Sequence, residues 1–278
     1  MTFYNRSRIV FLYAIFACIG GVPTIVAGRS ALREIVDCEH DFARVAAEKD
    51  TRTAFLTYMM DDALVFSPDV TGAKAFWEAR KTPTALLEWA PNFADAASDG
   101  SVGYTTGNWQ WRASRTGDPS SFGEFNTIWI RQPDGKFKWL VDMGISHEKP
   151  ASYSTALVTP SRTARNRGES SVVGTLSKFD TEALASAKNA YTSFASTEIR
   201  LFREGRSPFF GPDAIAGAVG SSPVTFGDPI VKRSASNMFI IVRPYSSGSE
   251  KGNQLQVWKY DKEFRTWKIV LDVWNRVS

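Results

Sequence analysis

The feature that most constrains the fold is a hairpin-like segment that occurs twice. Residues 123–147 read as two strands rich in β-forming residues, joined by a turn at Pro133-Asp134-Gly135. Residues 252–275 repeat the pattern, and both copies carry a central Trp in the first strand and an Asp that closes the second, Asp142 and Asp272. Two such segments, each closing one half of the chain, predict a duplicated domain.

The first 28 residues have the pattern of a secretory signal peptide. Arg6 and Arg8 precede an apolar run from Ile9 to Cys18, and small residues offer a cleavage site near Ala27 or Gly28. A membrane anchor is the alternative, since the apolar run is almost long enough to span. A lipoprotein signal ending at Cys18 is disfavoured by the bulky Phe16. The sequence therefore predicts a periplasmic or secreted protein.

Composition narrows the classes of partner. Removing Arg6 and Arg8 with the signal lowers the formal net charge from +4 to +2, which does not favour nucleic acid. Cys38 is then the single cysteine, so neither a disulfide within the chain nor a Cys-based metal site is expected. With two isolated histidines and no phosphate loop, dinucleotide fingerprint or nucleophile elbow, we predict no metal and no cofactor. No membrane contact is expected once the signal is removed.

The first half of the mature chain predicts helices followed by strands. An apolar stripe at helical spacing is formed by Leu32, Ile35, Val36, Glu39, Phe42, Val45 and Ala46. A second helix capped by Asp50 or Thr51, a short strand at 63–66 and a helix at 72–81 follow. Strands at 86–97 and 102–114 then lead into the hairpin. The order predicts an α+β domain in which a curved antiparallel sheet wraps over the N-terminal helices as a cone with a pocket at its open end.

Motifs in this half resemble a known family. They are Ala46-Ala47-Glu48-Lys49, Ala54-Phe55-Leu56-Thr57-Tyr58, Asp61-Asp62-Ala63-Leu64-Val65-Phe66, Trp89-Ala90-Pro91, Gly103-Tyr104-Thr105-Thr106-Gly107-Asn108-Trp109 and Asp134-Gly135-Lys136-Phe137-Lys138, together with Phe42, Gly72 and Trp77. Residues 32–148 resemble a SnoaL-like domain of the nuclear transport factor 2-like superfamily, and most closely its exported branch of unknown function. The resemblance implies the cone-shaped fold. It does not imply one activity, because the superfamily contains isomerases, cyclases, dehydratases and binding modules.

The second half repeats the plan in divergent form. We predict a first domain over 29–148, a linker rich in Ser, Thr, Pro and Gly over 149–178, and a divergent second domain over 179–278. A helical stripe runs through Leu184, Ala187, Tyr191 and Phe194, with no clear equivalent of the second helix of the first domain. Strands are expected near 224–235, 238–246, 253–260 and 265–276. If one copy keeps a working pocket, the pattern indicates the first.

Asp142 is the leading candidate for chemistry. Both faces of its strand are otherwise apolar, so a carboxylate there is expected to point into a cavity. In proteins that this half resembles, this strand position faces the pocket. A buried carboxylate has a raised pKa, as a general base requires. Tyr104, Thr106 and Trp109 are expected to donate to it, and His147 is a possible base or proton relay near the rim. The alternative is a structural Asp bonded to an indole or a helix end. The repeated Asp272 favours that alternative.

Aromatic residues supply the candidate binding surface. The predicted ligand-binding set, which includes the polar candidates, is Tyr58, Trp77, Trp89, Tyr104, Thr106, Trp129 and Asp142. Trp109 and Trp111 share strand parity, so they point to the side opposite Tyr104 and Thr106. One of these two pairs of residues is expected to face the helices, and the other pair is expected to face away from them. Outward aromatics further predict an internal pseudo-dimer, or a homodimer, through the sheet faces.

Three functions are compatible with these features. The first is an exported protein that binds a small apolar or ring-shaped ligand in the cone of the first domain. The second is an isomerase or dehydratase that uses Asp142 as general base with Tyr104 or His147. The third is a non-catalytic protein-interaction module.

Overall fold

The computed structural model describes residues 24–81, 84–154, 156–160 and 172–277. The predicted signal peptide lies outside this part of the chain, except that residues 24–28 belong to the first helix. Among the described helices, none combines the length and hydropathy that a membrane crossing requires.

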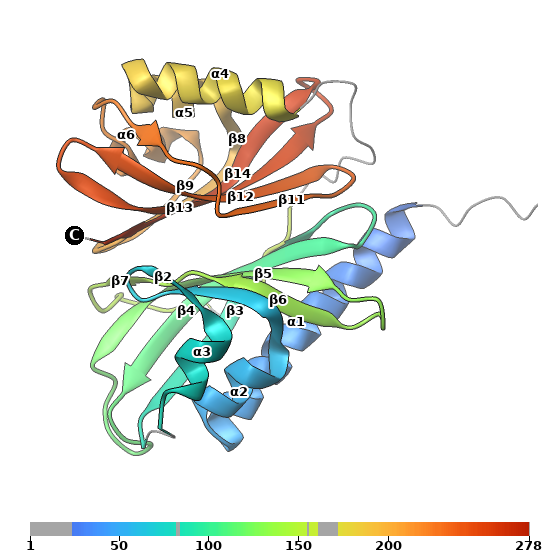
Figure 1. Ribbon diagram of the computed structural model, residues 1–278, viewed down its shortest axis with the longest axis vertical. Coiled ribbons are helices and arrows are strands. Elements are labelled where there is room, and N and C mark those ends of the chain that lie inside the picture. Colours follow the sequence, from blue (N-terminus) through green and yellow to red (C-terminus); the bar gives the residue numbers. More distant parts are fainter. Residues whose placement is uncertain (1–23, 82–83, 155, 161–171, 278) are drawn as a thin grey trace, which may run out of the picture.

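The first domain has three helices and seven strands (Figure 1). Its helices are α1 (Thr24–Glu48), α2 (Thr51–Tyr58) and α3 (Ala73–Glu78). Its strands are β1 (Met59–Phe66), β2 (Val70–Gly72), β3 (Leu86–Ala96), β4 (Val102–Arg112), β5 (Ser121–Arg131), β6 (Phe137–Asp142) and β7 (Ile145–His147). They are ordered β2-β1-β6-β5-β4-β3, with β7 beside β5. The predicted α+β cone is thereby confirmed.

The predicted antiparallel sheet requires one correction. Strand β1 pairs with β6 in parallel, while every other pairing in this sheet is antiparallel. The chain leaves β1, passes through α3 and the meander, and returns beside β1 in the same direction. A parallel pair needs such a long crossover, so the sheet is mixed.

Helix α1 supplies the floor of the first cone. Ile35, Phe42 and Ala46 on its predicted stripe are buried against the sheet in one hydrophobic cluster. Asp50 caps α2, as expected, because its Oδ1 accepts a hydrogen bond of 2.7 Å from the Thr53 amide. The cap ends α1 and turns the chain so that Phe55 packs against the same interior.

A β-bulge in β6 sets the direction of Asp142. Trp129 of β5 is opposite Trp139, but Ile128 is opposite Val141, so Leu140 is the additional residue. The bulge reverses the alternation of side chains, which lets both Trp139 and Asp142 face the cone. A matching shift in the second sheet lets Ile269 and Asp272 face the second cone.

The second domain repeats this architecture more closely than predicted. Its helices are α4 (Val172–Ala185), α5 (Ala187–Phe194) and α6 (Ile215–Ala218), with a short 3-10 turn η1 (Pro212–Ala214). Its strands are β8 (Ala195–Arg203), β9 (Arg206–Phe210), β10 (Thr225–Phe226), β11 (Val231–Ser234), β12 (Met238–Ser247), β13 (Glu250–Asp261) and β14 (Thr266–Arg276). They are ordered β10-β12-β13-β14-β8-β9, with β11 beside β12 and the single parallel pair formed by β14 and β8.

Two predictions about the second domain need correction. The stripe read as one helix is broken at Ser186, whose hydroxyl caps α5 by accepting from the Asn189 amide. Helix α5 is therefore the equivalent of α2 that the sequence did not show, and Leu184 on the supposed stripe is exposed. Helix α4 starts at Val172, within the range assigned to the linker.

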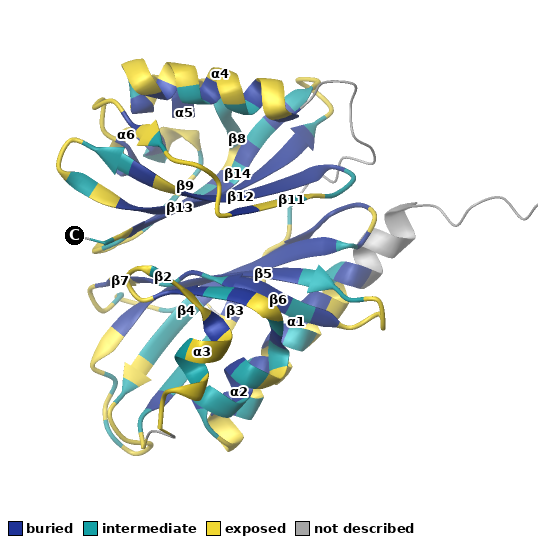
Figure 2. Cartoon of the chain, viewed as in Figure 1, coloured by how far each residue is buried: buried dark blue, intermediate teal, exposed yellow. Residues whose placement is uncertain are grey.

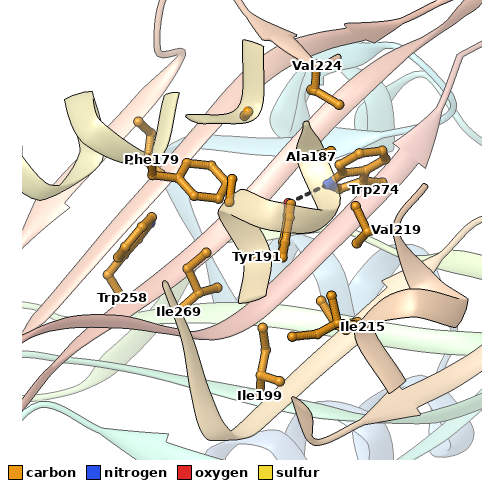
Figure 3. Close-up of a cluster of buried hydrophobic side chains, with 14 of the residues drawn as sticks. Phe179, Ala187, Tyr191, Ile199, Ile215, Val219, Val224, Trp258, Ile269 and Trp274 are labelled. Carbon is orange, nitrogen blue, oxygen red and sulfur yellow. Dashed lines mark hydrogen bonds between the residues drawn. The ribbon is translucent and has the colours of Figure 1, made fainter. Parts of the chain in front are cut away.

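The interior of the second domain is filled by aromatic and aliphatic side chains from its helices and sheet. Phe179 of α4 and Tyr191 of α5 meet edge to face at 5.3 Å between ring centroids, and Phe179 meets Trp258 in the same way at 5.4 Å (Figure 3). The indole Nε1 of Trp274 donates to the Tyr191 hydroxyl at 3.1 Å. These contacts fill the interior between the helices and the sheet of the second domain.

The two sheets face each other, with the helices of each domain on the outer sides (Figure 1). One cluster of buried side chains contains residues of both sheets, among them Phe93 and Tyr104 of the first domain and Phe202 and Leu255 of the second. The facing strands are largely buried (Figure 2). Each sheet therefore covers the outer face of the other.

Polar contacts also join the domains. The Lys259 ammonium lies 2.8 and 2.7 Å from the two carboxylate oxygens of Asp95, and both side chains are buried. The Ser98 amide donates to the Asn237 side-chain oxygen at 2.9 Å. Near the cone mouth, the Gly205 amide donates to the Ser146 carbonyl at 2.8 Å. These contacts fix the lateral register of the two sheets, which apolar packing alone does not specify.

Candidate functional site

A cavity of about 840 Å³ lies in the first domain, at the end of the sheet where β1 and β6 terminate. Eight aromatic residues line it: Phe55, Phe66, Phe76, Trp77, Trp89, Trp109, Trp111 and Phe125. Glu204, Asn275, Arg276 and Val277 of the second domain complete its wall. Its volume and aromatic lining are those of a small-molecule site.

Asp142 lines this cavity with a carboxylate that has few protein partners. Its Oδ2 accepts a hydrogen bond of 2.8 Å from the Thr127 hydroxyl. Within the described part of the chain, the Asp142 side chain has no second hydrogen bond and no ion pair. Burial raises the pKa of Asp142 from 3.8 to about 6, and the Thr127 hydrogen bond offsets part of the rise. The carboxylate therefore titrates near neutral pH and keeps Oδ1 available to a ligand.

Glu39 of α1 is a fully buried carboxylate behind the cavity wall, whereas Asp142 is half-buried. Its Oε1 accepts from the Trp89 indole at 2.6 Å, and its Oε2 accepts from the Thr105 hydroxyl at 2.6 Å and the Trp129 indole at 3.1 Å. Burial raises the pKa of Glu39 to about 7. The three hydrogen bonds lower this pKa and the nearby charge of Asp142 raises it, but burial is the largest effect. Glu39 fixes the orientation of Trp89 and hence one wall of the cavity.

Sequence reasoning did not assign a role to Glu39, although the signal was present. Glu39 occupies a position on the apolar stripe of α1, flanked by Ile35 and Phe42. A carboxylate on the buried face of a helix needs donors from the opposing sheet. Two tryptophans and a threonine supply them here.

The aromatic walls are held by contacts with one another. Phe55 stacks on Trp77 at 4.2 Å between centroids, and Phe42 meets Trp89 edge to face at 4.7 Å. Because these rings are packed from behind, the cavity is formed before any ligand enters, which limits the ordering cost of binding.

Glycines make room for the Trp109 indole. A Cβ at Gly123 would lie 2.5 Å from two ring atoms of Trp109, so only glycine permits this approach. At Gly144, a Cβ would make an ordinary contact of 3.7 Å with the Trp109 Nε1. The absence of a side chain at Gly144 leaves the space beside Trp109 open.

The structure brings some predicted site residues together. Asp142, Trp77 and Trp89 line one cavity, as expected for a shared site. Trp129 is fully buried behind the wall as a donor to Glu39. Tyr58 also lies outside the cavity lining, and its hydroxyl donates to Asp41 at 3.1 Å.

Tyr104 and Thr106 were assigned to the wrong side of the sheet. The predicted alternation along β4 is present, but Thr105 faces α1 and Trp109 faces the cavity. Tyr104 is buried in the cluster between the two sheets, and Thr106 shares its face. Neither residue can donate to a ligand that contacts Asp142.

His147 does not join Asp142 either. It is buried in β7, where Nδ1 donates to the Glu148 carbonyl at 2.6 Å and Nε2 lies 3.6 Å from the Glu124 carboxylate. The Glu124 contact raises the His147 pKa. The proton relay expected at the rim is therefore not assembled. Among the described residues, no group of three or more His, Cys, Asp or Glu side chains is placed to hold a metal ion.

Comparison with known proteins gives a likeness of fold. No family model matches the chain, and no curated protein matches it. A candidate ketosteroid isomerase from Parabacteroides distasonis is 20% identical, with 37% of this chain and 86% of that chain covered and a TM-score of 0.32. An NTF2-like protein of unknown function from Pseudomonas putida is 17% identical, with 42% and 86% covered and a TM-score of 0.35. A cystatin-like fold protein from Burkholderia xenovorans is 15% identical, with 38% and 89% covered and a TM-score of 0.32.

These matches cover about one domain of this chain. The helices and curved sheet of each domain agree with the cone-shaped fold that the sequence resemblance implies. At such identities and TM-scores, nothing about activity is carried over from these proteins.

Proposed function

We propose that the first domain binds a small organic ligand with an apolar or ring-shaped body in its cavity. The observation that carries this proposal is a cavity of about 840 Å³ with aromatic walls that ends on a carboxylate with one protein hydrogen bond. Imperfect packing alone gives no reason for a carboxylate on the cavity wall, because removing part of that group from water with a single hydrogen bond costs free energy.

The two kinds of lining group have separate roles in this proposal. Trp77, Trp89 and Trp109 contact the body of the ligand and remove its apolar surface from water. Asp142 selects the polar group of the ligand and fixes its orientation.

The test uses tryptophan fluorescence and calorimetry with indole and 2-naphthol as probes. Gly144→Trp places a bulky side chain in the cavity, and Gly174→Trp, on the exposed face of α4, is the matched control. We expect saturable binding to the unmodified protein and to the control, and at least tenfold weaker binding to Gly144→Trp. Binding that is unchanged by Gly144→Trp would place the ligand elsewhere and refute the proposal.

Acid–base catalysis by Asp142 is a second candidate, favoured by its pKa of about 6 and its access to the cavity. A carboxylate with this pKa accepts a proton at neutral pH more readily than an ordinary Asp. The reaction class would be that of an isomerase or dehydratase. Asp142→Asn is expected to abolish turnover of such a substrate while a neutral ligand still binds, whereas retained turnover would exclude this role.

We further propose that the protein is exported to the periplasm or secreted. The support is the charged and apolar pattern of residues 1–28. Cell fractionation and N-terminal sequencing of the mature protein test this, with a new N-terminus expected near Ala27 or Gly28. An uncleaved protein in the cytoplasmic fraction would contradict it.

A further inference from the structure

The second domain provides an internal reference for the site in the first. Val65 of β1 pairs with Asp142, and Leu201 of β8 pairs with Asp272 in the same parallel register. The bulges before the two Asp residues also correspond. The strand register therefore identifies a counterpart near Asp272 for each strand residue near Asp142, and the caps Asp50 and Ser186 do the same for residues of α2 and α5.

In the second domain, the carboxylate is fully engaged by the protein. Arg203 lies 2.6 Å from the Asp272 Oδ2, while the Tyr191 hydroxyl and the Gln254 amide donate to Oδ1 at 2.8 and 2.9 Å. The Arg203 guanidinium also lies over the Trp274 ring, 4.4 Å from its centroid. A cation is thus held between a carboxylate and an aromatic face inside this cone.

In the first domain, the counterparts of these partners cannot supply the same contacts. Ser67 of the first domain corresponds to Arg203 of the second, and Phe55 corresponds to Tyr191. In the same way, Phe125 corresponds to Gln254 and Gly144 corresponds to Trp274. All four line the cavity. The cation and both neutral donors to Oδ1 are absent, and the space that they would fill is open.

We propose that the ligand of the first domain is a small organic cation, with an ammonium or guanidinium group on an apolar body. This inference rests on the proposed function. The cationic group pairs with Asp142 at the place that the Arg203 guanidinium occupies in the second domain, and the body contacts the indoles of Trp89 and Trp109. A charge-assisted hydrogen bond and an aromatic face together favour a cation over a neutral group of the same shape.

Other charged groups around the cavity are arranged compatibly with this proposal. Arg80 is exposed and stacks over the Phe76 ring at 3.4 Å, and Arg276 is also exposed. Glu204 lines the cavity from the second domain, and Glu39 lies behind Trp89. Among the lining residues, Asp142 and Glu204 are therefore acidic, and the basic Arg80 and Arg276 lie at exposed positions.

The test compares charged and neutral probes of one shape. Benzylamine and phenylguanidine are the cations, benzyl alcohol and phenylurea are the neutral counterparts, and benzoate is the anion. Calorimetry at pH 8 keeps Asp142 ionised. We expect each cation to bind at least tenfold more tightly than its neutral counterpart, and benzoate to bind least.

Two variants remove the cation preference by independent routes. Asp142→Asn removes the charge, with Asp118→Asn as an exposed control of equal charge change. Ser67→Arg supplies the second-domain cation within the chain, with Ser177→Arg on α4 as control. We expect the preference to fall at least tenfold in both site variants and in neither control, with circular dichroism confirming that each variant is folded.

The outcomes separate this inference from the proposed function. Equal binding of cations and neutral probes, or a preference that survives Asp142→Asn, would overturn the cationic ligand and leave the binding cavity standing. Absence of binding by every probe of either panel would overturn both. A preference for cations that both site variants abolish supports the assignment.

Discussion

The buried carboxylate of Glu39 makes the stability of the first domain depend on pH. Its pKa is raised from 4.5 to about 7, chiefly because the side chain is fully buried. In the unfolded chain the same group titrates near its ordinary value. Folding therefore favours the protonated form of Glu39, and this contribution to stability is fully present below pH 4.5 and is lost as the pH rises through 7.

The size of the effect follows from the displacement of the pKa. One pH unit of displacement corresponds to about 1.4 kcal/mol, so the rise from 4.5 to about 7 corresponds to about 3 kcal/mol. Between pH 4.5 and 7 the unfolded chain releases a proton that the folded chain retains. Above pH 7 both states are ionised and the loss does not grow further.

Glu39→Gln isolates the pH-dependent contribution of Glu39 to stability, because glutamine does not titrate. The assay is urea unfolding of the unmodified protein and the variant at intervals from pH 4.5 to 8, with Glu182→Gln at an exposed site of α4 as control. We expect the stability of the unmodified protein, relative to Glu39→Gln, to fall by about 3 kcal/mol over this range. A difference that does not change with pH would show that the donors Trp89, Thr105 and Trp129 compensate burial fully, and would refute the reasoning.

Three further predictions concern Lys259, Asp272 and Cys38. Lys259→Met leaves Asp95 buried without its cation and is expected to lower the free energy of unfolding in urea by about 3–5 kcal/mol. Adding Asp95→Asn to this variant is expected to recover part of the lost stability. A loss below about 1 kcal/mol would contradict a tight contact between the sheets. Asp272→Asn leaves Arg203 without its anion and should lower the free energy of unfolding by a similar amount. This loss should exceed the loss caused by Asp142→Asn. Equal losses of stability in the two variants would count against the difference between the two cones. The Cys38 thiol, whose pKa burial raises to about 12, should react with a disulfide reagent at pH 8 far more slowly in the folded than in the unfolded protein, and equal rates would disprove its protection.

The packing of the two sheets leads us to propose that the chain is an internal pseudo-dimer in solution. The support is the cluster that joins Tyr104 to Phe202 and the buried pair of Lys259 with Asp95. Small-angle scattering is expected to show one compact particle. A profile of two separated lobes would rule out this arrangement.

Much of the architecture could be predicted because local patterns determine it. The helical stripe through Ile35 and Phe42, the Asp50 cap and the repeated hairpin each act over a short stretch of chain. The break at Ser186 was missed because apolar spacing continues across it, while the cap that divides the helices depends on one hydroxyl. The parallel pairing of β1 with β6 was missed because it joins segments far apart in the sequence.

The candidate site was only partly predictable, for a reason that lies in strand geometry. Alternation fixes which residues of β4 share a face, but it does not say which face meets the helices. Tyr104 was therefore placed in the cone, although it packs against the second domain. Asp142 was placed correctly in the cavity, although the bulge at Leu140 that turns it there has no signal in the apolar pattern.

The two Asp residues show why a repeated residue does not imply a repeated role. Their shared position in the strand register favoured a structural role for both. Asp272 has such a role, because Arg203, Tyr191 and Gln254 complete its contacts. Asp142 keeps the position without those partners and faces open space with Thr127 alone. Because the Asp142 carboxylate has one protein partner and is open to the cavity, the difference between the copies supports our proposal that an organic cation binds there.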